Sequence, residues 1–506
     1  MNEIKMGAIL NYLRLFISLS IGLLLSPYIL SRLGTAEYGI YHLSSNIVSW
    51  LALCDFGISS STTTFLSKYQ AKNDKSGEAH YLSNLCVLML CISIFILFVG
   101  FSVFPFLGEL FPNFSSEELA LLNILYILML LNASAIFPMR GLIGISNARQ
   151  KFVIPSLINL ASSILTAFGT ITLLYYGFRS IALTILTITL GLLGMLLNVL
   201  YCFFYLQAKL KWNGIDTALC RSMISFSSWL FLDQIINMLN MSSGNIIVGM
   251  TCGSEEITVF SYGVLILSYY FMFSNNISTL FLPKIAKLIY NNQKVDYLWI
   301  NVGKYQAFTL GLFYSTFIIF GDYFLDLWIG DTLGERTSTV WLISIILITP
   351  ITVPLIQNLG WQILQAKNSM HYRVKGLIII APLFVLIGYF ASIYYSSIGL
   401  AFSVGASYLV GQGVYMNYIY KKILGLDVLL FFKSIMSKSL APALFVALAF
   451  LLNRHILESY GNCWCNLLIL ISIYCVTYLV VLINCYFTSH DISLYPRILT
   501  YLRLVK

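Results

Sequence analysis

Residues 8–31 read AILNYLRLFISLSIGLLLSPYILS, an apolar run with one charged residue, Arg14. A helix needs about 20 mostly apolar residues to cross a bilayer, and this run is long enough. It is too long for the apolar part of a cleaved signal peptide, and no small-residue cleavage site follows it. We therefore expect a first membrane-spanning helix here.

The rest of the chain has the same composition. Of its 506 residues, 59% are hydrophobic and 10% are charged, against roughly 25% charged in an average soluble domain. So few charges cannot cover a soluble protein of this size, which excludes the soluble, disordered and fibrous classes and predicts an all-α polytopic membrane protein. Fourteen apolar runs reach spanning length: 8–31, 39–66, 81–107, 118–145, 152–176, 180–206, 222–250, 256–283, 299–324, 338–365, 376–395, 398–420, 433–453 and 464–487.

The basic residues predict the orientation. The net charge of +9 comes from 29 basic and 20 acidic residues. With the N-terminus in the cytoplasm, 22 basic residues fall in the predicted inner loops and tails and four in the outer loops. Cytoplasmic loops are enriched in Lys and Arg, so both termini are expected to be cytoplasmic, and the charge excess does not indicate nucleic-acid binding. The three remaining basic residues lie within or at the edge of predicted helices: Arg14, Arg140 and Lys304.

A short motif occurs twice. Residues 34–41 (GTAEYGIY) and 253–260 (GSEEITVF) both fit G-[ST]-x-E-x-x-[IV]-[FY], at an offset of 219, and Asn147 and Asn368 follow at an offset of 221. A near-constant offset across four helices predicts two pseudo-symmetric six-helix lobes related as parallel repeats, as in secondary transporters. The alternative is that short outer turns favour Gly, Ser and Glu for local reasons. The predicted domains are 1–210 and 211–425 for the lobes, and 426–506 for two extra helices and a cytoplasmic tail.

Polar side chains lie on one face of two equivalent helices. An ionisable side chain in hydrocarbon is costly and usually faces a partner or a wet cavity. Helical spacing therefore predicts that both faces line a central cavity. Arg14 could instead extend to the inner interface, and Asp233 could be the structural partner of an arginine. The two sets are Asn11, Arg14, Ser18 and Gly22, and Asp233, Asn237, Asn240 and Gly244.

Other candidates lie near the predicted inner ends of helices. Arg140 and Lys304 could form a cationic rim or act as helix-end anchors. A strip with Gln357, Asn358 and Trp361 could contact sugar, because hydroxyl groups need amide partners; helix–helix hydrogen bonding is the alternative. The run Ser243, Gly244 and Asn245 is a poor helix interior, so we expect a break or hinge there.

Several kinds of chemistry have no motif in this sequence. No Walker sequence, G-x-S-x-G elbow or His pair with metal spacing is present,. The cysteines are scattered, and Cys463 with Cys465 is weak support for a metal site,. We therefore expect no cofactor, no metal and no enzymatic activity. A polysaccharide polymerase would also need a larger outer loop for its catalytic residues.

Four segments resemble bacterial O-antigen flippases, which belong to the polysaccharide transporter family of the multidrug/oligosaccharidyl-lipid/polysaccharide exporter superfamily. The string Leu33–Tyr41 (LGTAEYGIY) resembles their L-G-x-x-E-Y-G-x-Y segment. The others are Asp55–Gly57 (DFG), Phe226–Trp229 (FSSW) and Leu327–Gly330 (LWIG), the last placed after the ninth predicted helix. The resemblance covers the first twelve predicted helices.

The resemblance implies a V of two six-helix lobes with two extra helices. It also implies that an undecaprenyl-diphosphate-linked oligosaccharide passes from the cytoplasmic to the periplasmic leaflet of the bacterial inner membrane by alternating access, coupled to a proton or sodium gradient. Arg14 and Arg140 would attract the diphosphate. Relatives often carry an acidic residue where this chain has Asn245, which leaves ion coupling at that position in doubt. A polysaccharide polymerase and a chain-length regulator are the expected protein partners.

Two other transporter classes fit the sequence less well. A multidrug cation exporter would prefer a cavity with more acidic groups than Asp55 and Asp233 supply. A lipid II flippase would carry early motifs rich in Arg and Asp, which this sequence lacks.

Overall fold

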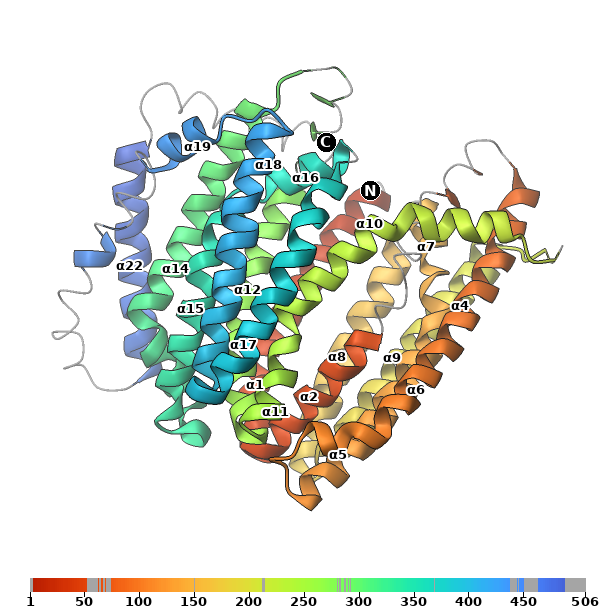
Figure 1. Cartoon of the computed structure of the whole chain (residues 1–506), viewed down its shortest axis with the longest axis horizontal. Coiled ribbons are helices and arrows are strands. Elements are labelled where there is room, and N and C mark those ends of the chain that lie inside the picture. Colours follow the sequence, from red (N-terminus) through yellow and green to blue (C-terminus); the bar gives the residue numbers. More distant parts are fainter. Residues whose placement is uncertain are drawn as a thin grey trace. The chain divides into compact units, whose positions relative to one another are not determined.

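The computed structural model is all-helical in the part of the chain it describes (Figure 1). Ten helices there are long and apolar enough to cross a membrane, which confirms the predicted class of all-α polytopic membrane protein. The described residues are 3–51, 62, 65–66, 69, 74–149, 151–211, 214–279, 281, 284–285, 288–289, 291, 293–367, 369–436, 444, 446–449 and 463–486. Asp55–Gly57, Asn368 and most of the predicted span 433–453 lie outside them, so the count of fourteen stays a prediction.

The chain divides into two compact units, and each is described by itself. One unit comprises residues 1–261 and 389–397, and the other comprises 262–388 and 398–506. The lobe boundaries expected near residues 210 and 425 stay a prediction.

The first unit is a ring of apolar helices. α6 packs against α2, α4 and α9, and α8 packs against α1 and α9, while α1 and α2 close the ring. α10 packs on α4, and α11 packs on α2. Tyr126 of α6 donates a hydrogen bond to the carbonyl of Gly100 on α4 at 2.8 Å. The elements are α1 (Glu3–Leu33), α2 (Thr35–Leu51), α4 (Lys75–Val103), η2 (Phe104–Phe106), α5 (Leu107–Leu110), α6 (Ser116–Arg140), α7 (Ile143–Ala148), α8 (Val153–Tyr175), α9 (Ser180–Leu200), η3 (Tyr201–Tyr205), α10 (Thr217–Met241), α11 (Ser243–Thr251) and the start of α12 (Ser254–Thr279).

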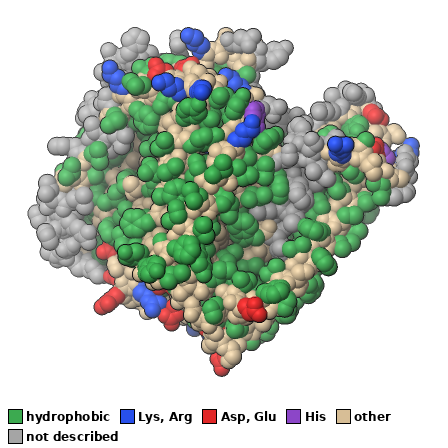
Figure 2. Space-filling model, viewed as in Figure 1, with side chains coloured by type: hydrophobic (Ala, Val, Ile, Leu, Met, Phe, Trp, Pro, Cys, Tyr) green, Lys and Arg blue, Asp and Glu red, His purple; other side chains and the backbone are tan. Residues whose placement is uncertain are grey.

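The second unit is built around α14, which packs against α15, α16, α19 and α22. Trp299 of α14 is fully buried and stacks on Phe431 of α19 with ring centroids 4.1 Å apart. In Figure 2, hydrophobic side chains cover much of the visible described surface of this unit, and Lys and Arg gather at the end near α18 and α19. The elements after α12 are α14 (Asp296–Leu333), α15 (Arg336–Ile356), α16 (Leu359–Ala366), α17 (Met370–Ser407), η4 (Tyr408–Tyr415), α18 (Met416–Lys422), α19 (Val428–Ile435) and α22 (Trp464–Tyr486).

The two copies of the repeated motif form shorter turns than the sequence suggested. The break after α1 is Gly34 alone, with φ of 81°, and the break before α12 is Gly253, with φ of 101°. Both values lie in the region that glycine adopts at no steric cost. The helices therefore resume at Thr35 and Ser254, not at the predicted residues 39 and 256.

Three predicted spans are broken and one is longer than expected. The seventh is divided at Ser242 into α10 and α11, the tenth at Gln357 and Asn358 into α15 and α16, and the fourth after Arg140 into α6 and α7. α14 has 38 residues, a length of roughly 57 Å at about 1.5 Å per residue. This length exceeds the hydrocarbon thickness. Because α14 ends at Leu333, Leu327–Gly330 lies inside the helix rather than after it.

Candidate functional site

Two of the predicted basic residues lie on different helices of the first unit. Arg14 lies on α1 and is half-buried, and Arg140 is exposed in the last turn of α6. Within the described part of the chain, neither guanidinium pairs with a carboxylate.

Asp233 is buried on α10, with 4% of its surface exposed. Asn237, one turn further along, is exposed and donates to the Asp233 carboxylate at 3.4 Å. Asn240 is buried and donates to the carbonyl of Ile236 at 3.2 Å. Asp233 lies on α10, which packs mainly on α4 and α11, and Arg14 lies on α1, which packs mainly on α8. These two helices are therefore not each other's main packing partners.

The helix break lies at Ser242, directly before the predicted run. Ser243 donates to the carbonyl of Leu239, and both Ser243 and Gly244 are buried. A Cβ atom at Gly244 would lie 2.2 Å from the ring of Phe260. Asn245 is buried and accepts a hydrogen bond from Ser261 at 3.1 Å. These contacts hold α11 tightly against the start of α12.

The remaining predicted residues lie in the second unit. Gln357 is fully buried and donates to Asn417 at 2.8 Å, which is the helix–helix bonding that the sequence left as the alternative. Asn358 and Trp361 are half-buried and lie nearer the surface. Lys304 is half-buried on α14.

The two copies of the repeated motif contact each other. Thr258 donates to the carbonyl oxygen of Thr35 at 2.6 Å. At the counterpart positions, a Cβ at Gly39 would lie 2.1 Å from the carbonyl oxygen of Ser254. Gly39 and Thr258 differ by the offset of 219, as do Thr35 and Ser254. Residues related by the repeat therefore make matching backbone approaches.

The glutamates of the two motifs also have matching roles. Glu37 accepts from the backbone N–H of Ser180, the first residue of α9, at 2.9 Å and pairs with Arg179 at 2.7 Å. Glu256 accepts from the hydroxyl of Ser397 at 2.5 Å, directly after the bend in α17 at Tyr395 and Ser396. Each glutamate thus binds the start of a helical segment, where a carboxylate is favourable. The sequence motif gave no sign of these partners.

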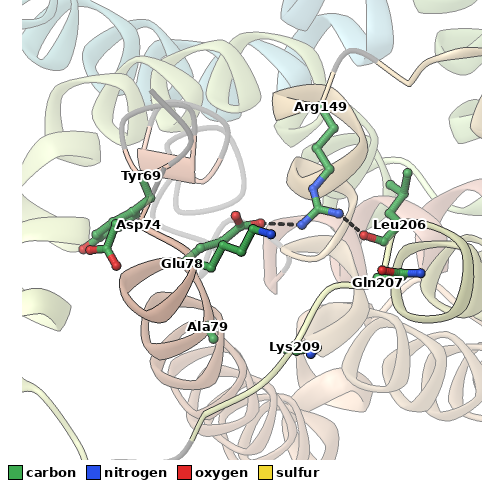
Figure 3. A pocket seen from close by; sticks show the side chains of 9 residues that line it. Tyr69, Asp74, Glu78, Ala79, Arg149, Leu206, Gln207 and Lys209 are labelled. Carbon is green, nitrogen blue, oxygen red and sulfur yellow. Dashed lines mark hydrogen bonds and ion pairs between the residues drawn. The ribbon is translucent and has the colours of Figure 1, made fainter. Parts of the chain in front are cut away.

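A cavity of about 430 Å³ lies where α4, α7 and the segment after η3 come together (Figure 3). Arg149 is its central side chain, pairing with Glu78 at 2.7 Å and donating to the carbonyl of Leu206. Burial and the carboxylates of Asp74 and Asp216 raise the pKa of Tyr69, which keeps its hydroxyl protonated. The lining residues are Tyr69, Asp74, Lys75, Glu78, Ala79, Arg149, Leu206, Gln207 and Lys209.

The connection from η3 to α10 is fastened to α4 beside this cavity. The backbone N–H of Lys211 donates to Ala79, and that of Asp216 donates to the side chain of Asn84 at 2.8 Å. The Asp216 carboxylate also lies 3.7 Å from His80. Sequence reasoning had counted Arg149 only as an orientation charge. It likewise missed Arg373, which is 5% exposed on α17. A pairing such as Glu78 with Arg149, across 71 residues, has no signal in one sequence.

Solved structures of membrane transporters have the same fold. The inward closed conformation of the lipid II flippase MurJ superposes with a TM-score of 0.74 at 17% identity, covering 94% of this chain and 98% of that one. An inward-facing multidrug resistance MATE family transporter of the MOP superfamily gives a TM-score of 0.65 at 15% identity, covering 80% and 97%. A MOP superfamily transporter from Pyrococcus furiosus gives 0.55 at 16% identity, covering 82% and 91%. The chain shares its fold with these three transporters.

The sequence comparison identifies the family. A family model described as polysaccharide biosynthesis protein matches residues 5–289, more than half of the chain, and the protein belongs to this family. A curated relative from Salmonella typhimurium, named "Putative O-antigen transporter", is 28% identical over 163 residues. That match covers 31% of this chain and 36% of the relative.

Proposed function

We propose that this protein is a flippase that carries an undecaprenyl-diphosphate-linked oligosaccharide from the cytoplasmic to the periplasmic leaflet of the bacterial inner membrane. Family membership and the MOP fold support a transporter of polysaccharide precursors. Alternating access of two lobes, coupled to a proton or sodium ion, is the mechanism we propose. Both termini would be cytoplasmic, and a polymerase and a chain-length regulator would receive the product.

The observation that carries the proposal is the position of Arg14. Its guanidinium is half-buried on an apolar helix and has no carboxylate partner among the described residues. A charge in hydrocarbon is costly and usually marks a substrate pathway. A positive side chain at this position would bind an anionic group of the cargo during its passage. A guanidinium can bind phosphate oxygens with two parallel hydrogen bonds. Arg140 would add a second positive charge at the predicted inner rim.

The experiment replaces Arg14 in a strain that depends on this gene for surface polysaccharide. A charge-assisted hydrogen bond contributes about 1.5–3 kcal/mol, so Arg14→Ala should lower polysaccharide output by roughly tenfold or more at normal protein abundance. Arg14→Lys should recover part of the output because it keeps the charge but not the bidentate geometry.

Arg32→Ala is the matched control. Arg32 is exposed near the end of the same helix and lies over the ring of Tyr28 at 5.4 Å. Wild-type output from Arg14→Ala, with Arg32→Ala also normal, would remove Arg14 from the mechanism.

A lipid II flippase is the second candidate, because MurJ aligns with 94% of this chain. Expression in cells depleted of their own lipid II flippase distinguishes the two functions. Restored growth would favour lipid II as the cargo, and no rescue is expected if the cargo is a polysaccharide repeat unit. A multidrug cation exporter, the third class, would instead confer ethidium efflux.

A further inference from the structure

A hydrogen-bonded seam joins three helices of the second unit. Ser274 of α12 donates to the carbonyl of Leu355 on α15 at 2.8 Å. Gln306 of α14 donates to the Ser274 carbonyl at 3.2 Å and to the Ser278 hydroxyl at 2.6 Å. Ser274, Ser278 and Gln306 are all fully buried. Buried polar groups that are paired in this way fix one arrangement of the helices, so the end of α15 is held in place.

This fixed helix end presents one residue at the break between α15 and α16. Asn358 donates one N–H to the side-chain oxygen of Asn275 on α12 at 2.7 Å and the other to the Ser274 hydroxyl at 3.2 Å. Gln357, the residue before Asn358, donates a hydrogen bond to the side-chain oxygen of Asn417 at 2.8 Å. Asn358 is therefore tied to the buried seam and cannot turn freely.

The paired amides retain one hydrogen-bond donor group and one acceptor. Asn358 has used both of its N–H bonds, which leaves its Oδ1, and Asn275 has used its Oδ1, which leaves its Nδ2,. Among the described residues neither atom has another partner. Asn275 is exposed and Asn358 is half-buried. A donor beside an acceptor matches two neighbouring hydroxyl groups of a sugar, each of which can donate and accept.

An aromatic ring lies one turn beyond the amide pair. Trp361 is half-buried, and Gln365 is exposed one further turn along α16. Asn358, Trp361 and Gln365 are spaced i, i+3 and i+7, which places them on one helix face. Leu359 and Ile363, on the other face, are fully buried. Exposed amides are unfavourable against lipid, so this face is expected to border water.

We propose that Asn275, Asn358 and Trp361 form a carbohydrate-binding subsite for the oligosaccharide part of the cargo. The amide pair bonds two neighbouring hydroxyls of one sugar residue, and the indole ring packs on the apolar face of the sugar. Small-molecule sites commonly combine an aromatic surface with a few fixed polar groups. This subsite rests on the proposed function, and it assigns sugar recognition to residues different from Arg14, which would hold the diphosphate.

The test measures two ligands with purified full-length protein in detergent. One probe is the oligosaccharide released by mild acid from the lipid-linked repeat units of the same cells, and the other is undecaprenyl diphosphate without sugar. Asn275→Ala and Asn358→Ala should each weaken oligosaccharide binding about fivefold, since a hydrogen bond contributes on the order of 1 kcal/mol and a tenfold change corresponds to about 1.4 kcal/mol. Both variants should bind undecaprenyl diphosphate like the wild type.

Asn417→Ala is the matched control. It removes the hydrogen bond from the buried side chain of Gln357, which is similar in length to the bond between Asn358 and Asn275. It should lower the unfolding temperature and leave oligosaccharide affinity unchanged. Trp361→Phe should keep most of the affinity and Trp361→Leu should lose it. If Trp361 only anchors the helix at the membrane interface, both variants would bind the oligosaccharide equally, which would overturn its assigned role.

The outcomes separate this subsite from the proposed function. Wild-type affinity for the oligosaccharide in Asn275→Ala and Asn358→Ala, each shown to be folded by its unfolding temperature, would overturn the subsite while leaving lipid-linked transport standing. A wild-type protein that binds neither probe would overturn the proposed function, and the subsite with it.

Discussion

Thr258 donates a 2.6 Å hydrogen bond to the carbonyl oxygen of Thr35, and these residues belong to the two copies of the motif found in the sequence. At the counterpart pair, Gly39 approaches the carbonyl of Ser254 so closely that a methyl group has no room. The repeat offset of 219 therefore relates contacts as well as residues. This junction joins the start of α2 to the start of α12.

Gly39→Ala tests the junction. The added Cβ would lie 2.1 Å from a backbone oxygen, which cannot move aside as a side chain can. Overpacking of this kind costs about 1–3 kcal/mol, more than the roughly 1 kcal/mol that alanine gains over glycine in a helix. We expect a lower unfolding temperature for the detergent-purified protein.

Gly108→Ala is the control for that substitution. Gly108 lies in the short helix α5, and nothing lies within 4 Å of the added atom. Its unfolding temperature should stay unchanged or rise slightly. Equal unfolding temperatures for the two variants would show that the close approach at Gly39 does not affect the stability of the protein.

Arg149→Ala should destabilise the first unit. The substitution leaves the carboxylate of Glu78, a side chain that is 11% exposed, without its partner and frees the carbonyl of Leu206. Breaking a fully buried ion pair costs about 3–5 kcal/mol of stability. The Arg149 side chain is 25% exposed, so solvent screens the pair and we expect a smaller loss in the free energy of unfolding, about 2 kcal/mol. Arg149→Lys should recover little, since an ammonium lacks the planar fork.

The comparison is made with Lys209→Ala, which removes an exposed cation from the lining of the same cavity. Chemical unfolding of the purified variants gives the measurement. Similar stabilities for Arg149→Ala and Lys209→Ala would contradict the structural role given to the Arg149–Glu78 pair.

Asp233→Asn separates coupling from packing at the buried carboxylate of α10. Asparagine keeps the size of the side chain and an oxygen that can accept from Asn237,, but it cannot take a proton. If Asp233 carries the coupling ion, polysaccharide output should fall at least tenfold while protein abundance stays normal. Asn237→Ala, which leaves the carboxylate in place, should retain most of the output.

The opposite pattern would count against ion coupling at Asp233. Wild-type output from Asp233→Asn would show that the carboxylate need not titrate, and loss of protein from the membrane would indicate a structural role. Immunoblotting of membranes beside the polysaccharide assay distinguishes these results.

The sequence was sufficient for the class and for much of the helix order. Long apolar runs mark spanning helices whatever their partners, and a glycine that separates two such runs, as Gly34 and Gly253 do, marks a turn through its own backbone. The turns themselves were shorter than predicted, because a single residue with positive φ is enough to end one helix and start the next. Hydropathy could not locate the break at Ser242, which interrupts an apolar run.

Side-chain partnerships could not be predicted from this one sequence. Gln306 and Ser274 are ordinary polar residues within apolar runs, and their bond joins residues 32 positions apart on different helices. Asn275 was missed for the same reason, although its partner Asn358 was a candidate. Which polar residues meet is decided by helix rotation and packing, and neither can be read from the spacing along one helix.

The proposed function is the movement of lipid-linked repeat units between leaflets. The most direct measurement is the leaflet position of these units in spheroplasts of a deletion strain, read with a membrane-impermeant reagent that labels sugars on the outer face. We expect the units to accumulate unlabelled in the deletion strain, and we expect the wild-type gene, but not Arg14→Ala, to restore labelling. Full labelling in the deletion strain would contradict the proposed function, because the units would then cross the membrane without this protein.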